Sequence, residues 1–327
     1  MIDERRPTDP TVLVIGGFLS SPPVYGPFRE RLLERGVRHV EVARIWTPDW
    51  LLSVRRGGGP IATRAARSLL KAVDVADDVP LLIVGHSASG VVARVLTATE
   101  PYEGRRFAGA RRVGAIVSLG SPHINAMEAD QTRWKGSGSA TFANRYVPGA
   151  FWAPRVGYLS VASRWLAAPS QGERDGREQA ARRFYERTLP PPHAPIIEGD
   201  GLIPVEAALL PGARQLVLDD AAHAPGAGHP WYGSQDIIDE WWPTALETWQ
   251  DALAARAELT TVDLVDPALA SDASSVAEAA VTPLNLPDPC VPRTSWTSMA
   301  HQTASQRNGS ALGGPHRLAR RPWLHPT

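Results

Sequence analysis

Short apolar runs alternate along the chain with segments whose apolar residues recur at helical spacing. The runs predict strands at residues 11–15, 37–42, 80–84, 113–119, 156–161 and 215–218. The segments between and after them predict helices at 28–35, 61–75, 87–99, 204–210 and 237–255. Several runs, such as Val12-Leu13-Val14-Ile15, are apolar without alternation, as is typical of strands buried on both faces of a parallel sheet. The pattern therefore predicts a three-layer α/β domain of about six mostly parallel strands with helices on both faces.

Two irregular stretches interrupt this alternation. Residues 124–155 carry scattered glycines between two strands, and residues 168–195 contain a helical stretch at 176–188. Long connections of this kind are usually functional or disordered. We interpret both as lid or pocket-wall segments inserted into the domain, and two solvent-exposed surface loops are the alternative.

The composition changes at about residue 259. The remainder, 259–327, is rich in Ser, Thr, Ala and Pro, and its apolar residues are too sparse to build a core. Disorder is the expected state of such a tail. We therefore expect a folded domain over residues 1–258 followed by a disordered tail.

Composition excludes several classes of protein. The formal net charge is +0 and the basic residues are dispersed, so the electrostatic pattern of a nucleic-acid binder is absent. The single cysteine, Cys290, allows no intramolecular disulfide. The charged N-terminus lacks the apolar region of a signal peptide, and no run of 18 apolar residues could span a bilayer. These features predict a cytoplasmic protein without an integral membrane segment, and they leave the oligomeric state open.

The segment Val84-Gly85-His86-Ser87-Ala88-Ser89-Gly90 carries the strongest chemical signal. It joins a predicted strand to a predicted helix, and a serine among small residues at such a junction is typical of a nucleophile elbow. The tight turn strains the backbone of the nucleophile and requires small neighbours. Gly85 meets this requirement, whereas Ser89 stands where a second glycine is expected. We predict Ser87 as a nucleophile; a glycine- and serine-rich turn without chemistry is the alternative.

A serine nucleophile needs a histidine to accept its proton and an acid to orient that histidine. His223 follows the last predicted strand, at the sheet edge where Ser87 also lies. His229 competes for the role of base. Asp200, between two glycines, is the predicted acid, and its place between Ser87 and His223 matches the Ser…Asp…His order of one hydrolase architecture. Competing nearby carboxylates are Glu198, Asp219 and Asp220.

Acyl transfer also requires donors for the oxyanion, usually two backbone N–H groups. One is predicted at Ala88, directly after the nucleophile. The other is predicted at Phe18, in the glycine-led loop that follows the first strand, with Leu19 as the fallback. The loop lacks the glycine and lysine spacing of nucleotide-binding loops.

On these residues the chain resembles the α/β-hydrolase fold superfamily, and within it a lipase- or esterase-like group of bacterial, cyanobacterial and plant proteins. The shared motifs are Gly17-Phe18-Leu19, Gly85-His86-Ser87-Ala88, Leu119-Gly120-Ser121-Pro122-His123, Gly199-Asp200-Gly201, His223-Ala224-Pro225 and Trp231-Tyr232-Gly233-Ser234. The resemblance spans residues 10–255. The chain departs from the group at Ser89, where glycine is usual, and at Ser121, where threonine is more common. His123 is open to two interpretations, a second base or a structural histidine that binds the lid segment.

The resemblance implies a lipase- or esterase-like serine hydrolase with Ser87, Asp200 and His223 as triad and Phe18 and Ala88 at the oxyanion hole. Its expected partner is a small apolar carboxylic ester. No cofactor is expected, and the histidines lack metal-ligand spacing. Two alternatives remain: a thioesterase or acyltransferase that uses the same triad, and a non-catalytic protein of this fold that binds a ligand.

Overall fold

A computed structural model of the 327-residue chain describes residues 9–124, 126, 138–172 and 175–258. The predicted tail at 259–327 and residues 127–137 of the first irregular stretch lie outside this part. All described residues belong to one compact unit.

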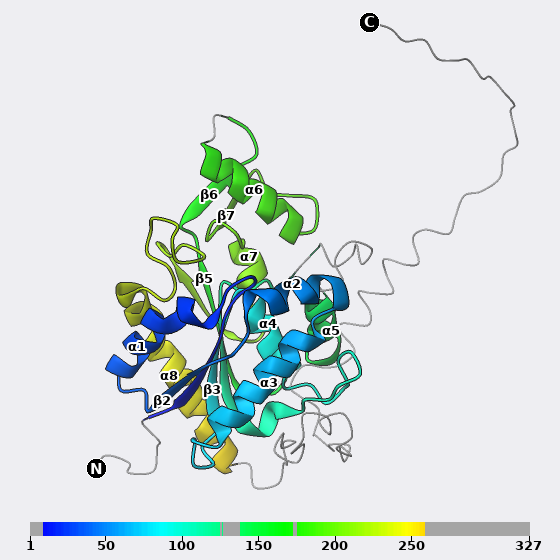
Figure 1. The fold of residues 1–327 in the computed structure, drawn as a ribbon. Coiled ribbons are helices and arrows are strands. Elements are labelled where there is room, and N and C mark those ends of the chain that lie inside the picture. The colour runs from blue at the N-terminus through cyan, green and yellow to red at the C-terminus, as the bar shows by residue number, and fades with distance from the viewer. Residues whose placement is uncertain (1–8, 125, 127–137, 173–174, 259–327) are drawn as a thin grey trace, which may run out of the picture. The chain divides into compact units, whose positions relative to one another are not determined.

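Six parallel strands form the central sheet, in the spatial order β2-β1-β3-β4-β5-β8 (Figure 1). They are β1 (Thr11–Ile15), β2 (His39–Val42), β3 (Leu81–His86), β4 (Val113–Leu119), β5 (Gly157–Ser163) and β8 (Arg214–Leu218). Every predicted strand is present, with bounds that shift by at most two residues. β1, β3 and β4 are buried along their full length. The apolar runs without alternation are therefore the central strands of a parallel sheet, as predicted.

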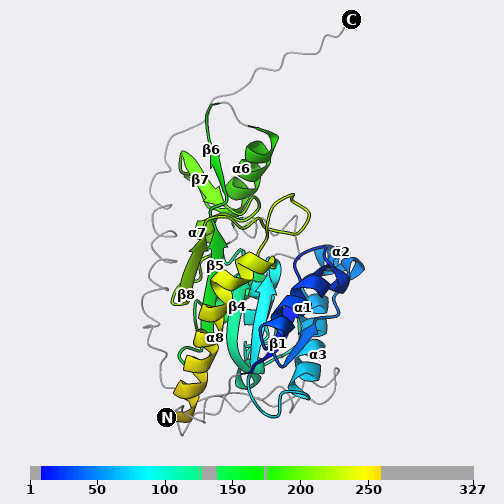
Figure 2. The ribbon, with the colours of Figure 1, turned by 90° about the vertical axis from the view of Figure 1, so that its left-hand side faces the viewer.

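Helices cover both faces of the sheet. On one face, α1 (Gly26–Glu34) and α8 (Gln235–Glu258) pack on alternate strand residues, among them Val12, Val14, Leu82 and Val84. On the other face, α3 (Gly59–Val73) and α4 (Ala88–Val95) contact each other and the central strands (Figures 1 and 2). The Trp249 indole N–H of α8 donates to the Pro80 carbonyl at 2.7 Å, which fixes this helix to the start of β3.

The remaining elements include several that the sequence pattern did not predict. They are η1 (Pro22–Tyr25), α2 (Thr47–Arg56), η2 (Gly109–Arg112) and α5 (Gly138–Tyr146). The helix predicted at 204–210 is present as α7 (Val205–Ala208). Part of the first irregular stretch, 124–155, folds as α5, whose Ala140 and Ala143 are buried.

The second irregular stretch folds around a small core of its own. β6 (Leu166–Pro169) pairs antiparallel with β7 (Ile196–Gly199), and α6 (Gly176–Thr188) packs against them. Figure 1 shows this unit beyond the end of the sheet at which β5 leads into β6. The Arg182 guanidinium, buried at the centre, donates to the carbonyls of Ala168, Ala194 and Pro195. The helix predicted at 176–188 is confirmed as α6.

The described helices offer no candidate for a membrane span, because none combines sufficient length with sufficient apolar character.

The proposed domain boundary at residue 258 is testable by truncation. A chain that ends after Glu258 keeps every described element, so we expect its thermal unfolding midpoint to stay within a few degrees of that of the full chain. A chain that ends after Thr248 loses the fully buried Trp249, and the loss of such a side chain costs about 3–5 kcal/mol. Calorimetry of both would check this. Unfolding of the 258-residue chain would show that the boundary is wrong.

Candidate active site

Ser87 occupies a strained turn between β3 and α4. Its φ of 56° and ψ of −132° lie in a region that residues other than glycine rarely adopt. The chain is crowded here: a Cβ on Gly85 would lie 2.6 Å from the Gly90 backbone, and one on Gly90 would lie 2.1 Å from Ser121 Oγ. The Ser87 N–H donates to the Leu119 carbonyl at 2.9 Å, so the neighbouring strand holds the strained residue.

The serine at position 89 has a defined place in the turn. Ser89 is fully buried, and its hydroxyl donates to the Gly16 carbonyl at 2.6 Å. The departure from the usual glycine thus adds a hydrogen bond between the elbow helix and the glycine loop after β1.

The structure brings the three predicted residues Ser87, His223 and Asp200 into one hydrogen-bonded line. Ser87 Oγ lies 3.0 Å from His223 Nε2, and His223 Nδ1 lies 2.8 Å from Asp200 Oδ2. Because a carboxylate only accepts, Nδ1 carries the ring proton and Nε2 presents its lone pair to the Ser87 hydroxyl. Ser87 keeps 7% of its surface exposed and His223 keeps 9%. The line can therefore transfer a proton from the serine to the imidazole.

Four hydrogen bonds fix the Asp200 carboxylate. The N–H groups of Leu202 and Ile203 donate to Oδ1 at 3.0 and 2.7 Å. Oδ2 accepts from His223 Nδ1 and also from the Tyr232 hydroxyl, which lies 3.0 Å away. Burial, and then the charge of Asp200, raise the pKa of Tyr232 well above its usual value, so this hydroxyl stays a donor. At Gly120, a Cβ would lie 2.5 Å from Asp200 Oδ2. Glycine at this position of the Leu119–His123 motif leaves room for the carboxylate.

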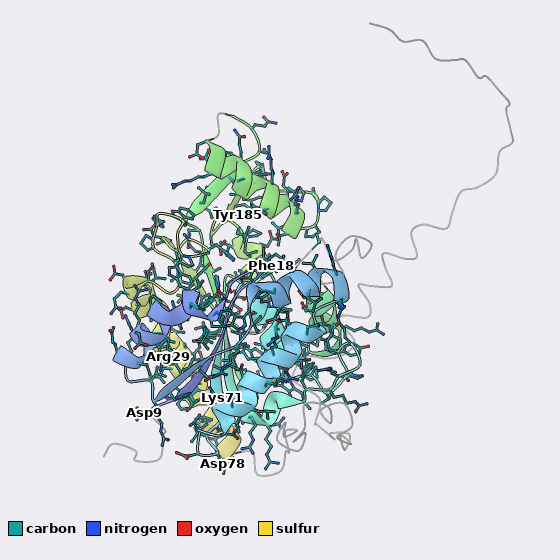
Figure 3. All side chains as sticks on the ribbon, viewed as in Figure 1. Asp9, Phe18, Arg29, Lys71, Asp78 and Tyr185 are labelled. Atoms are coloured by element: carbon teal, nitrogen blue, oxygen red, sulfur yellow. The ribbon has the colours of Figure 1, made fainter. Side chains whose placement is uncertain are left out.

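The glycine loop after β1 lies against the nucleophile. A Cβ on Gly17 would be 2.9 Å from the Cβ of Ser87. Phe18 follows at the same end of the sheet (Figure 3), and Leu19 has a positive φ of 60°. Ala88 is the first residue of α4. Within the described residues, the backbone N–H groups of Phe18 and Ala88 have no acceptor, which leaves both free to bind an anionic oxygen.

The competing residues pair with groups other than Ser87. His229 binds Asp220 at 2.6 Å, and Asp219 forms an ion pair with Arg164 at 3.1 Å. Glu198 lies on β7 and is exposed. The geometry therefore favours His223 and Asp200 over each competitor.

His123 holds structure around α5. Its Nε2 bonds Ser118 Oγ at 3.0 Å, and its carbonyl accepts from the Asn144 side chain at 2.8 Å. Burial, and then the charge of Arg94, lower its pKa well below the ordinary value. These contacts favour the structural interpretation over that of a second base.

Sequence reasoning missed Tyr25, His86 and Tyr232 as parts of the site. His86 had a positional signal, because it directly precedes Ser87, and Tyr232 lies in one of the shared motifs. Tyr25 had none, since a buried aromatic near a loop usually belongs to the core. His86 is 4% exposed, and its burial and the proximity of His223 lower its pKa to about 3.

The described residues contain no group of three or more His, Cys, Asp or Glu side chains that could hold a metal ion.

Comparison with solved structures identifies the fold of the chain. The sequence matches no family model and no curated protein. A lipase of Bacillus licheniformis matches in structure with a TM-score of 0.51 and 13% identity, over 75% of this chain and 95% of that one. Phospholipase PlaB of Legionella pneumophila matches with a TM-score of 0.47 and 14% identity, over 77% of this chain and 62% of that one. Esterase 2 of Thermogutta terrifontis matches with a TM-score of 0.41 and 16% identity, over 79% of this chain and 87% of that one. The chain has the α/β-hydrolase fold, as the resemblance implied.

The buried neutral His86 predicts a loss of stability in acid. Its pKa is about 3 in the folded protein and about 6.5 in an unfolded chain, so below pH 6.5 only the unfolded chain takes up the proton. The free energy of unfolding should fall by about 2 kcal/mol between pH 7 and pH 5 from this group, and His123 acts in the same direction. Urea unfolding at both pH values would measure this change in the free energy of unfolding. In His86→Gln the free energy of unfolding should fall less between pH 7 and pH 5, by the contribution of His86. An equal fall in both proteins would contradict the conclusion that His86 is buried in its neutral form.

Proposed function

We propose that the protein is a serine hydrolase that cleaves carboxylic esters through an acyl-enzyme on Ser87. The hydrogen-bonded line from Ser87 Oγ through His223 to Asp200, at 3.0 and 2.8 Å, carries this proposal. The strained backbone of Ser87 supports it, because strain of this kind clusters at functional sites. A structural serine would need neither the strain nor the aligned histidine.

In the proposed reaction, His223 Nε2 removes the hydroxyl proton as Ser87 Oγ attacks the ester carbonyl. The N–H groups of Phe18 and Ala88 stabilise the oxyanion of the tetrahedral intermediate. As the intermediate collapses, His223 returns the proton to the leaving alcohol and the acyl group remains on Ser87. A water that loses its proton to His223 then attacks the acyl-enzyme, which releases the acid and restores the serine. No cofactor takes part.

The side chains beside the glycine loop support the proposal that the ester has an apolar part. Phe18 and Leu19 are each 42% exposed, and the Phe18 ring contacts that of Trp50 in α2 at a centroid distance of 5.7 Å. The Thr47 hydroxyl donates to the Leu19 carbonyl and holds the loop to this helix. Leu51 on the same helix is 57% exposed. An acyl or alkyl chain leaving the carbonyl site would find apolar surface here.

Covalent labelling tests the nucleophile. A fluorophosphonate reacts quickly only with an activated serine, so we expect modification of one peptide, that containing Ser87, located by mass spectrometry. Ser87→Ala should abolish labelling and lower kcat for a short-chain aryl ester by about 10⁶-fold. A folded protein that is not labelled, or is labelled elsewhere, would favour the ligand-binding alternative.

Replacement of Asp200 tests the acid. Asp200→Asn keeps the size of the side chain but no longer fixes the tautomer of His223, so kcat should fall by about 10⁴-fold. Asp219→Asn is the matched control, because Asp219 is another carboxylate near His223 in sequence but pairs with Arg164. Its kcat should stay within about twofold of that of the unmodified enzyme. Comparable losses in the two variants would remove Asp200 from the proposed triad.

A further inference from the structure

Two buried side chains join the parts of the proposed active site to one another. Tyr25 ends the short helix η1 after the glycine loop and is 1% exposed. His86 ends β3, directly before Ser87. The Tyr25 hydroxyl lies 2.8 Å from His86 Nδ1. Their hydrogen bonds go to backbone groups and to each other, and the His86 ring lies beside the His223 ring at a centroid distance of 5.0 Å. Neither side chain takes or gives a proton in the proposed mechanism, so their pairing needs another explanation.

The direction of each hydrogen bond follows from the groups involved. His86 Nε2 lies 2.6 Å from the carbonyl of His223, and a carbonyl only accepts, so Nε2 carries the proton. His86 Nδ1 then accepts from the Tyr25 hydroxyl. The Tyr25 oxygen in turn accepts from the Gly17 N–H at 2.7 Å. One directed chain therefore runs from the glycine loop, through Tyr25 and His86, to the backbone of the proposed base.

The charge states of both side chains preserve this direction. Burial raises the pKa of Tyr25 above its ordinary value, and the pKa of His86 is lowered to about 3. Between about pH 5 and 9 the tyrosine remains a hydroxyl and the histidine a neutral imidazole. The chain of donors and acceptors does not reverse within this range.

Both ends of the chain lie on backbone that the proposed reaction needs in place. Gly17 precedes Phe18, the proposed oxyanion donor, and lies against Ser87. At the other end, the backbone N–H of His223 donates to the Asp200 carbonyl at 2.9 Å while its carbonyl accepts from His86. The base is thus held at the N–H and carbonyl of its backbone and at Nδ1 of its ring.

We propose that Tyr25 and His86 are positioning residues that fix the oxyanion loop and His223 relative to Ser87. The proposal rests on the proposed function. Its consequence is kinetic: loss of the Tyr25 hydroxyl frees the Gly17 N–H and the His86 Nδ1 lone pair, so the oxyanion donor and the base both lose alignment. Misalignment of this kind slows the chemical step and leaves substrate binding nearly unchanged.

Tyr25→Phe is the first test, with Tyr158→Phe as the matched control. Tyr158 is also a buried tyrosine, but its hydroxyl accepts from the Trp152 N–H near the start of β5. For a short-chain ester we expect Tyr25→Phe to lower kcat by about 10- to 100-fold and to change KM by less than about threefold. Tyr158→Phe should leave kcat within about twofold. Equal kcat values in the two variants would overturn the proposal, even if Tyr25→Phe is the less stable protein.

Variants of His86 provide a second test if Tyr25→Phe fails to fold. The amide nitrogen of glutamine reaches the position of His86 Nε2 and keeps the donor to the His223 carbonyl, whereas leucine keeps only the volume. We expect His86→Gln to retain at least about tenfold more kcat than His86→Leu. Equal kcat in the two would assign His86 to packing alone and overturn the proposal.

Fluorophosphonate labelling separates this proposal from the proposed function. If the unmodified enzyme is labelled at Ser87 and Tyr25→Phe reacts about tenfold or more slowly, both stand. If the two react at the same rate, the positioning proposal is overturned and the proposed function stands. If the folded, unmodified enzyme is not labelled, both are overturned.

Discussion

The close approach of β3 and α4 around Ser87 is the constraint on which the rest of the site depends. The backbones at Gly85 and Gly90 meet so tightly that a Cβ on Gly85 would clash with Gly90. This tight turn forces Ser87 to a positive φ, and in that conformation the Ser87 side chain projects toward His223. Such strain persists only where the surroundings over-determine it. Here the Leu119 carbonyl bonds the Ser87 N–H, and Ser89 bonds the Gly16 carbonyl.

Parallel register explains why residues distant in sequence meet at this turn. β3 and β4 end opposite Val161 of β5, and β5 and β8 end together two residues later, at Ser163 and Leu218, so the strands end close to one level. The loops that follow β3 and β8, together with the one after β7, then need only a few residues to bring Ser87, His223 and Asp200 together. The sheet supplies the common edge, and the hydrogen bonds of the loops supply the final alignment.

The central strands could be predicted because burial on both faces requires a run of apolar residues without alternation. The helices α1, α3, α4 and α8 could be predicted because their apolar residues recur at helical spacing. Ser87, Asp200 and His223 were predictable for a related reason, since each follows a strand end with small residues around it. β6 and β7 escaped prediction because each has four residues and gains its stability from pairing with the other and with α6. α2 and α5 also escaped prediction; α2 packs against α3, and α5 packs against α4.

Tyr25 and Tyr232 show the limit of sequence reasoning in physical terms. The sequence does not show whether the hydroxyl of a buried tyrosine has a hydrogen-bond partner, because the fold decides which groups lie near it. Tyr232 reaches Asp200 because the Trp241 indole N–H of α8 donates to the Tyr232 carbonyl at 2.9 Å and holds its backbone. Tyr25 reaches His86 because η1 returns the chain over the glycine loop. In both cases a helix and a polar bond act together, so the buried core and the proposed chemistry share the same side chains.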